Sequence, residues 1–179
     1  MSRVLVAPFT RVLDAASIRG DHALAIEATD QECVAIARFL GILGLESLSA
    51  QFVVNRSRRG DVELGGTFRA KLTQACVVSL VPVPQDIVEE VNRRFVPADR
   101  SASAHQQLAV VDPDVEDPPE FYPPAGIDVG SVVLEQLALA LDPYPRAPGV
   151  VLPDVADAPE EEMGSPFAVL KSLGHSDSS

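Results

Sequence analysis

The sequence predicts an α+β protein with an antiparallel sheet of about five or six strands, packed by two main helices plus a short C-terminal helix. Three observations support this fold class. Apolar residues alternate along 48–55 and again beyond residue 62, a capping box at Thr29 opens a segment with helical spacing, and residues 129–141 are almost entirely apolar. The alternation fits an open sheet and a partly open barrel equally well.

The N-terminal third begins with two short predicted strands, at 3–9 and 23–28. Thr29-Asp-Gln-Glu32 then has the form of a capping box, in which the Thr29 hydroxyl and the Glu32 carboxylate each accept a backbone hydrogen bond. We therefore expect a helix over 30–40. One face of it carries the apolar residues Cys33, Ile36, Ala37 and Leu40.

A hairpin is predicted next. The strand 48–55 directs Leu48, Ala50, Phe52 and Val54 to one side, and Arg56-Ser-Arg-Arg-Gly60 forms the turn. The following strand resumes at Val62, with Gly65-Gly66 predicting a bulge or a bend. Pro82 and Pro84 are expected to end it, and residues 86–96 to form a further strand.

The C-terminal half alternates between polar and apolar segments. Residues 97–124 are rich in Pro, Asp and Ser, which predicts a flexible acidic loop. Asp128 is a good N-cap for the helix at 129–141, which we expect to be buried on nearly all sides. We predict a single α+β domain over 1–148 and an acidic tail over 149–179. The tail contains a short helix at 166–173.

Charge is distributed unevenly between the two halves. The net charge is −12, yet residues 1–96 hold 11 basic and 11 acidic residues, so residues 97–179 account for all of it. Like charges repel, so the acidic half is a poor surface for nucleic-acid phosphates and suits a basic protein partner.

No segment has the features of a secretory signal or reaches 18 consecutive apolar residues, so we expect a cytoplasmic protein without membrane contact. Cys33 and Cys76 lie in apolar segments of different types. Two thiols do not make a disulfide framework, and we expect both to be buried structural residues.

The sequence contains no motif that indicates catalysis. The three histidines share no motif spacing, and no nucleophile, phosphate-loop or dinucleotide fingerprint occurs. We predict a non-enzymatic protein with no catalytic residue, no cofactor-binding residue and no small-molecule substrate.

Two sets of residues are candidates for binding. The first is a basic face for RNA phosphates, for which an ordinary charged hairpin turn is the alternative; it comprises Arg56, Arg58, Arg59, Arg69 and Lys71. The second is the apolar side of the C-terminal helix, where Phe167, Leu170 and Leu173 are candidates for docking to a partner.

Three stretches carry a family resemblance. They are Lys71–Leu80 continuing to Phe95-Val-Pro97, then Gly126–Arg146 with its Asp-Pro-Tyr-Pro-Arg end, and Ser165–Lys171. Together they resemble the YceD family, the large ribosomal RNA subunit accumulation proteins. The resemblance covers roughly residues 70–173. It implies a bacterial factor that supports accumulation of 23S ribosomal RNA and biogenesis of the large ribosomal subunit.

The chain departs from this family at one point. Many members carry a Cys-x-x-Cys motif with further Cys or His residues downstream, a set that resembles a zinc site. Here the two motif positions are Cys76 and Ser79, and His175 is the single Cys or His after Arg146. A structural zinc ion needs about four ligands, so we predict that no metal is bound.

The resemblance leaves two modes of action open. The protein supports large-subunit biogenesis by binding ribosomal RNA, a pre-ribosomal particle or another assembly partner. Alternatively, it is an acidic module that holds a basic ribosomal protein without direct contact to RNA.

Overall fold

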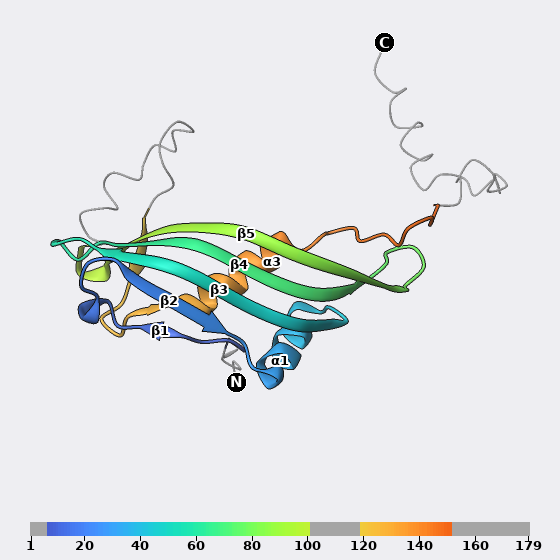
Figure 1. Ribbon diagram of the computed structural model, residues 1–179, viewed down its shortest axis with the longest axis horizontal. Coiled ribbons are helices and arrows are strands. Elements are labelled where there is room, and N and C mark those ends of the chain that lie inside the picture. The colour runs from blue at the N-terminus through green and yellow to red at the C-terminus, as the bar shows by residue number, and fades with distance from the viewer. Residues whose placement is uncertain (1–6, 101–118, 152–179) are drawn as a thin grey trace, which may run out of the picture.

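The computed structural model describes residues 7–100 and 119–151, to which the structural statements below refer. Figure 1 shows the arrangement. In chain order the elements are β1 (Val12–Leu13), η1 (Ala15–Ser17), β2 (His22–Glu27), α1 (Asp30–Leu40), β3 (Gly44–Arg56), β4 (Val62–Ala75), β5 (Pro82–Pro97), η2 (Ala98–Arg100), β6 (Glu120–Tyr122), β7 (Ile127–Asp128) and α3 (Val129–Ala140).

Five strands form one open sheet in the order β2-β3-β4-β5-β6, and β1 pairs with β7 in a separate two-stranded sheet. The α+β class and the strand number are confirmed, and the sheet is not closed into a barrel. The sheet is antiparallel as expected, except at one edge, where β6 runs parallel to the end of β5. Such a parallel pair requires a long connection, and the chain supplies one between residues 97 and 120.

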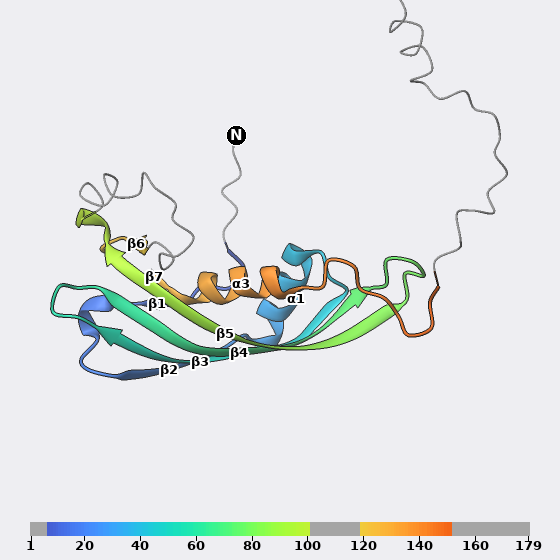
Figure 2. The same cartoon turned by 90° about the horizontal axis from the view of Figure 1, so that it is seen from above.

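Both helices lie on the concave side of the curved sheet (Figure 2). The predicted alternation of β3 is confirmed, since Leu48, Ala50, Phe52 and Val54 are all buried. Val133 and Leu137 of α3 join the same core. The opposite, convex face of the sheet is exposed and carries mainly polar residues, together with apolar ones such as Val53 and Val88.

The capping box at the start of α1 is confirmed. The Thr29 hydroxyl accepts a hydrogen bond from the Glu32 amide at 3.3 Å, and the Glu32 carboxylate accepts one from the Thr29 amide at 2.8 Å. Gly41 ends the helix with a φ of 69°, a left-handed conformation that favours glycine.

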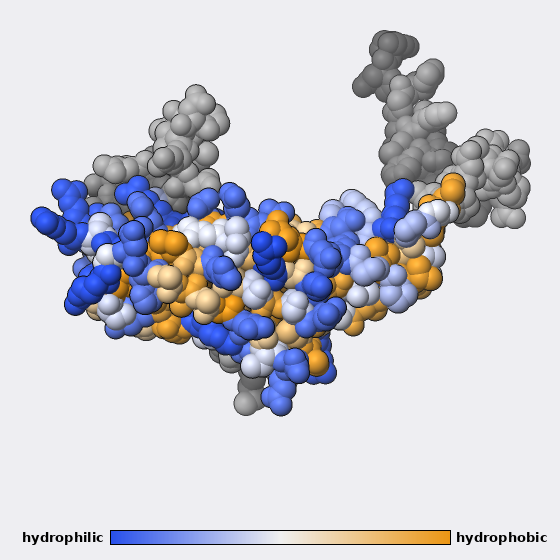
Figure 3. All heavy atoms as spheres, in the orientation of Figure 1, coloured by the Kyte–Doolittle hydropathy of each residue, from blue (hydrophilic) through white to orange (hydrophobic). Residues whose placement is uncertain are grey.

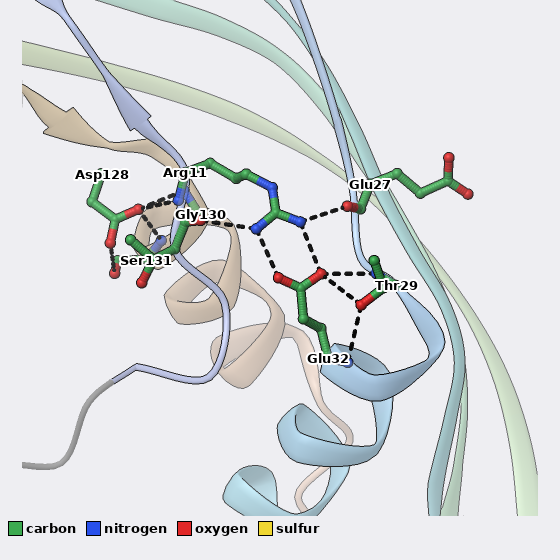
Figure 4. A network of polar contacts seen from close by, with 8 residues as sticks. Arg11, Glu27, Thr29, Glu32, Asp128, Gly130 and Ser131 are labelled. Carbon is green, nitrogen blue, oxygen red and sulfur yellow. Dashed lines mark hydrogen bonds and ion pairs between the residues drawn. The ribbon is translucent and has the colours of Figure 1, made fainter.

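Arg11 joins the N-termini of the two helices (Figure 4). Its guanidinium donates two hydrogen bonds of 2.8 Å to the Glu32 carboxylate, one to each oxygen. Its backbone amide donates to the Asp128 carboxylate at 2.7 Å. Asp128 in turn caps α3 by accepting from the amides of Gly130 and Ser131. The segment that carries Arg11 therefore fixes both helices relative to each other.

The strand expected at 3–9 is tested only in its last three residues. Residues 7–9 form no strand, and residues 3–6 lie outside the described part. Instead, Phe9 is buried in the core. The chain also crosses Gly130 so closely that a Cβ there would lie 2.8 Å from the Phe9 carbonyl oxygen and from the Arg11 amide. At residue 9, packing against the start of α3 takes the place of strand pairing.

Two expectations for the central strands are also corrected. The β3–β4 register runs unbroken past Gly65 and Gly66, and its irregularity lies between Leu45 and Ser47. Gly66 is needed for close approach, because a Cβ there would lie 2.1 Å from the Gln51 carbonyl oxygen. Pro82 and Pro84 lie inside β5 rather than before it. β6 pairs only with Phe95–Pro97, so the first part of β5 has no outer neighbour in the described structure and tolerates residues without an N–H.

The predicted loop at 97–124 is ordered at both ends. β5 extends to Pro97, η2 follows, and β6 forms before residue 124, while residues 101–118 lie outside the described part. The prediction that α3 is buried on nearly all sides is wrong on one side, where the Leu139 side chain is 72% exposed. α3 covers a single sheet, and no further layer lies over its outer face in the described structure.

Candidate nucleic-acid interface

The β3–β4 turn is a compact loop that presents Arg58 and Arg59 to solvent. The Ser57 amide donates to the Asp61 carbonyl oxygen at 2.8 Å, and the Ser57 hydroxyl accepts from the amides of Arg59 and Asp61. Gly60 adopts a φ of 91°, so a side chain at this position would be strained. The local hydrogen bonds thus fix the backbone while the arginine side chains stay exposed.

Asp61 binds two further arginines next to this turn. Its carboxylate forms ion pairs with Arg100, which follows β5, and with Arg94 of β5, the latter at 3.7 Å. The Arg100 guanidinium also donates to the Arg59 carbonyl oxygen at 3.5 Å. The Asp61 side chain is only 17% exposed. We name the combined surface of Arg56, Arg58, Arg59, Arg94 and Arg100 the arginine end.

A hydrogen bond from Tyr122 holds the backbone of the arginine end in place. Its buried hydroxyl donates a hydrogen bond of 2.7 Å to the Gly60 carbonyl oxygen. Tyr122 belongs to β6, so the strand that returns after residue 118 is tied to the turn between β3 and β4. Next to this bond lies an open cavity of about 420 Å³. It is lined by Asp14, Ala15, Ala16, Arg56, Arg58, Arg59, Gly60, Pro97, Ala98, Asp99, Tyr122 and Pro124.

The three turn arginines have no carboxylate partner in the described part of the chain. Within residues 7–100 and 119–151, none of Arg56, Arg58 and Arg59 forms an ion pair. The cavity has two acidic residues in its lining, Asp14 and Asp99, against these three arginines. Its lining therefore carries a net charge of +1, in a chain whose net charge is −12.

The structure separates the five residues predicted to form one basic face. Arg69 and Lys71 lie on the convex face of β4, where they pair across strands with Val88 and Asp86 of β5. Arg69 is seven residues beyond Val62, which places it roughly 23 Å along the strand from the turn. Arg56, Arg58 and Arg59 lie together, whereas Arg69 and Lys71 form a second, separate group.

Sequence reasoning overlooked Arg94 and Arg100. The register pairs Val62 with Phe95 and Glu63 with Arg94, so the end of β5 returns to the start of β4. Two long strands of nearly equal length joined by a short turn make this return necessary. The signal was therefore present in the sequence, as a basic end of β5 opposite a basic hairpin turn.

The remaining predicted docking residues, Phe167, Leu170 and Leu173, lie outside the described residues. The polar and charged residues of α3 are accounted for in part, because Glu135 pairs with Arg93 of β5 at 3.3 Å. No helix within the described ranges is long and apolar enough to cross a membrane.

Cys76 and Cys33 are both buried free thiols, as predicted. The Cys76 Sγ accepts hydrogen bonds of 3.4 Å from the amides of Ser79 and Ala147. Hydrogen bonds from the Ser79 side chain and from these amides lower the pKa of the Cys76 thiol to about 6. Burial instead raises the pKa of the Cys33 thiol. Among the described residues, no three His, Cys, Asp or Glu side chains are grouped as metal ligands.

Comparison with known proteins gives one match. Residues 64–174 fit the family model described as large ribosomal RNA subunit accumulation protein YceD. The match covers more than half of the chain. The chain belongs to the YceD family. Neither the curated proteins nor the solved structures contain a match.

The YceD match begins two residues into β4 and runs through α3 to residue 174. It includes Arg94, Arg100 and Tyr122, whereas Arg56, Arg58 and Arg59 precede it. The family description ties its members to accumulation of large-subunit ribosomal RNA, and it names an accumulation protein rather than a reaction.

Proposed function

We propose that this YceD-family protein supports 23S ribosomal RNA accumulation and large-subunit biogenesis in the cytoplasm by binding, without catalysis, and that the arginine end contacts RNA phosphates. The observation that carries the proposal is the set of three turn arginines, Arg56, Arg58 and Arg59, which form no ion pair within the described residues. They line one part of an open cavity whose lining also contains Asp14 and Asp99, on a chain with a net charge of −12.

The geometry suits a phosphate backbone better than a small molecule. Guanidinium groups bind phosphate oxygens in a bidentate manner, and several on one surface follow successive phosphates. The backbone of the turn is fixed by its own hydrogen bonds and by Tyr122, so less ordering is needed when a ligand binds. Among the described residues of the lining, Tyr122 is the single aromatic one, and it is buried, which favours contact with the RNA backbone over stacking on bases.

Co-sedimentation with large-subunit precursor particles tests this proposal. Arg58→Glu/Arg59→Glu places two carboxylates on the turn and should abolish co-sedimentation. Arg38→Glu/Arg146→Glu is the matched control, because it changes the net charge equally at exposed positions away from the turn. The proposal fails if the turn variant co-sediments as well as the control, or if both variants lose the particle to the same degree.

The second candidate is an acidic module that holds a basic ribosomal protein without RNA contact. The uneven charge favours it, since residues 97–179 account for the whole net charge of −12. Acidic segments raise the rate of encounter with a basic partner and make binding sensitive to salt. Removal of residues 149–179 should weaken such a complex, whereas Arg58→Glu/Arg59→Glu should leave it unchanged. The opposite pattern supports the arginine end.

A further inference from the structure

The end of the sheet opposite the arginine end has an unusual construction. There the turn between β4 and β5, residues 76–81, is bound to the segment that follows α3. The Val77 amide donates to the Pro145 carbonyl oxygen at 2.8 Å, and the Ala147 amide donates to the Cys76 Sγ at 3.4 Å. The Gln74 side-chain amide donates to the Asp142 carbonyl oxygen at 3.1 Å. Segments about 70 residues apart therefore form one fixed platform.

Large apolar side chains are exposed on this platform, which we name the apolar end. Figure 3 shows apolar residues, interspersed with polar ones, at the end of the molecule that carries the β4–β5 turn. Leu80 is 75% exposed, Tyr144 70% and Val151 84%. The apolar end comprises the exposed apolar residues of the turn and of the segment bound to the turn, namely Val77, Leu80, Val81, Tyr144 and Val151. A cluster of exposed apolar residues on a soluble domain marks an interaction surface.

Leu80 shows that the exposure is built into the backbone. Its φ of 61° is the single positive value for a non-glycine residue in the described structure. This conformation is unfavourable for a residue with a branched side chain, and a turn has no need of leucine when glycine would fit. The conformation directs a large apolar side chain into solvent, where no described residue covers it. A segment that binds to the Leu80 side chain would bury it and would explain why this unfavourable backbone conformation is kept.

We propose that the apolar end is the docking site for the chain's own C-terminal segment, residues 165–173. The Ala147 amide donates to Cys76 of the turn, and the Val150 amide donates to the Ala147 carbonyl oxygen at 3.3 Å, so the chain reaches its last described residue, Val151, four residues after a contact with the turn. If residues 165–173 form the predicted helix, Phe167, Leu170 and Leu173 lie on one side of it. This apolar side could cover the exposed apolar residues of the apolar end. Docking would bury both sets of side chains together.

The connecting residues 152–164 are long enough to let residues 165–173 reach the apolar end and short enough to keep them near it. Residues 152–164 span at most about 43 Å when fully extended and about 20 Å as a random chain. A tether of this length gives an effective concentration in the millimolar range, which favours the chain's own segment over a separate partner. The family match runs from residue 64 to 174, so the apolar end and residues 165–173 both lie inside the stretch that family members share.

Disulfide formation tests the docked geometry. In the full-length chain, Leu80→Cys/Leu170→Cys places a thiol on each surface, while the natural Cys33 and Cys76 are buried. Val53→Cys/Leu170→Cys is the matched control, because Val53 is an exposed apolar residue on the convex face of the sheet. With diamide as oxidant, we expect the intramolecular disulfide to form at least tenfold faster in the first variant. Equal rates, or disulfides found only between two chains, would overturn the proposal.

Hydrogen exchange tests the same contact in a nearly natural chain. Phe167→Asp removes the apolar anchor, and Ser172→Asp adds the same charge to the polar side of the predicted helix. We expect amides in 76–81 and 144–151 to exchange severalfold faster in the first variant only. Unchanged exchange in Phe167→Asp would contradict docking. Protection that rises with protein concentration would assign the apolar end to a second copy and would equally overturn the proposal.

Discussion

The hydroxyl of Tyr122 donates a 2.7 Å hydrogen bond to the carbonyl oxygen of Gly60. This contact joins β6 to the β3–β4 turn across 62 residues of sequence. Gly60 lies between Arg59 and Asp61, so the contact fixes the backbone from which the arginine end is displayed. A residue of the matched YceD stretch thereby supports a turn that precedes the match.

Tyr122→Phe should destabilise the protein. The substitution leaves the Gly60 carbonyl oxygen buried without its partner, which costs about 1–3 kcal/mol. Urea unfolding followed by circular dichroism measures the loss. Tyr144→Phe is the control, since the Tyr144 ring is largely exposed and the variant should unfold at the same midpoint as the natural protein. Equal unfolding midpoints for all three proteins would show that the Tyr122 hydrogen bond does not stabilise the turn.

Gly66→Ala should be among the most damaging small substitutions in the sheet. The added Cβ would lie 2.1 Å from the Gln51 carbonyl oxygen and 2.7 Å from a ring carbon of Phe52. The backbone of β3 would have to move, so we expect a loss at or above the upper end of the ~1–3 kcal/mol typical of overpacking. Gly44→Ala adds the same atom where nothing lies within 4 Å. Thermal unfolding of the two variants should differ clearly, and similar melting temperatures would contradict the close approach.

The Arg11–Glu32 pair should make stability depend on acid pH. The hydrogen bonds from the Arg11 guanidinium, and then that from the Thr29 amide, lower the pKa of Glu32 from 4.5 to about 2. The folded protein therefore favours the ionised carboxylate, and this contribution is present above pH 4.5 and is lost as the pH falls towards 2. Glu32→Gln should show a smaller loss of stability over that interval in urea titrations.

The control for this effect is Glu27→Gln. The Glu27 carbonyl oxygen accepts from Arg11, but its carboxylate points away from the guanidinium (Figure 4). The variant should keep the acid dependence of the natural protein. If Glu32→Gln retains that dependence as well, the ion pair does not produce it.

Cys76 should cause a second pH dependence, at neutral to alkaline pH. The hydrogen bond from the Ser79 side chain and those from the Ala147 and Ser79 amides lower the pKa of its thiol from 9.0 to about 6. Its contribution to stability is therefore complete above pH 9 and is lost as the pH falls through 6. Between those values, the stability of the natural protein relative to Cys76→Ala should rise with pH. A constant difference in unfolding free energy from pH 6 to 9 would show that the thiolate is not favoured.

Local patterns predicted much of the fold. The capping box at Thr29 and the alternation in β3 each depend on neighbouring residues, and the structure confirms both. The failures involve residues whose roles are set by distant contacts. Gly66 is required by β3 across the sheet, and Phe9 is buried against the start of α3. Neither requirement leaves a local pattern in the sequence.

The candidate site was predictable to a similar extent. Arg56, Arg58 and Arg59 are adjacent in sequence, so their common position followed from one turn. Arg94 and Arg100 join them through the β4–β5 register and through Asp61, which had no role in the sequence pattern. Arg69 and Lys71 were grouped with the turn by sequence proximity, but strand geometry carries them away from it.

RNA binding measured over a range of salt concentrations tests the central claim most directly. The full-length protein is titrated with a transcribed fragment of 23S ribosomal RNA and compared with the Arg56→Gln/Arg58→Gln/Arg59→Gln variant. Each phosphate contact contributes about 0.7–0.9 to the slope of log affinity against log salt. We predict weaker binding by the variant and a slope whose magnitude is smaller by about two to three. Equal affinity and equal slope for the two proteins would contradict an RNA-binding role for the arginine end.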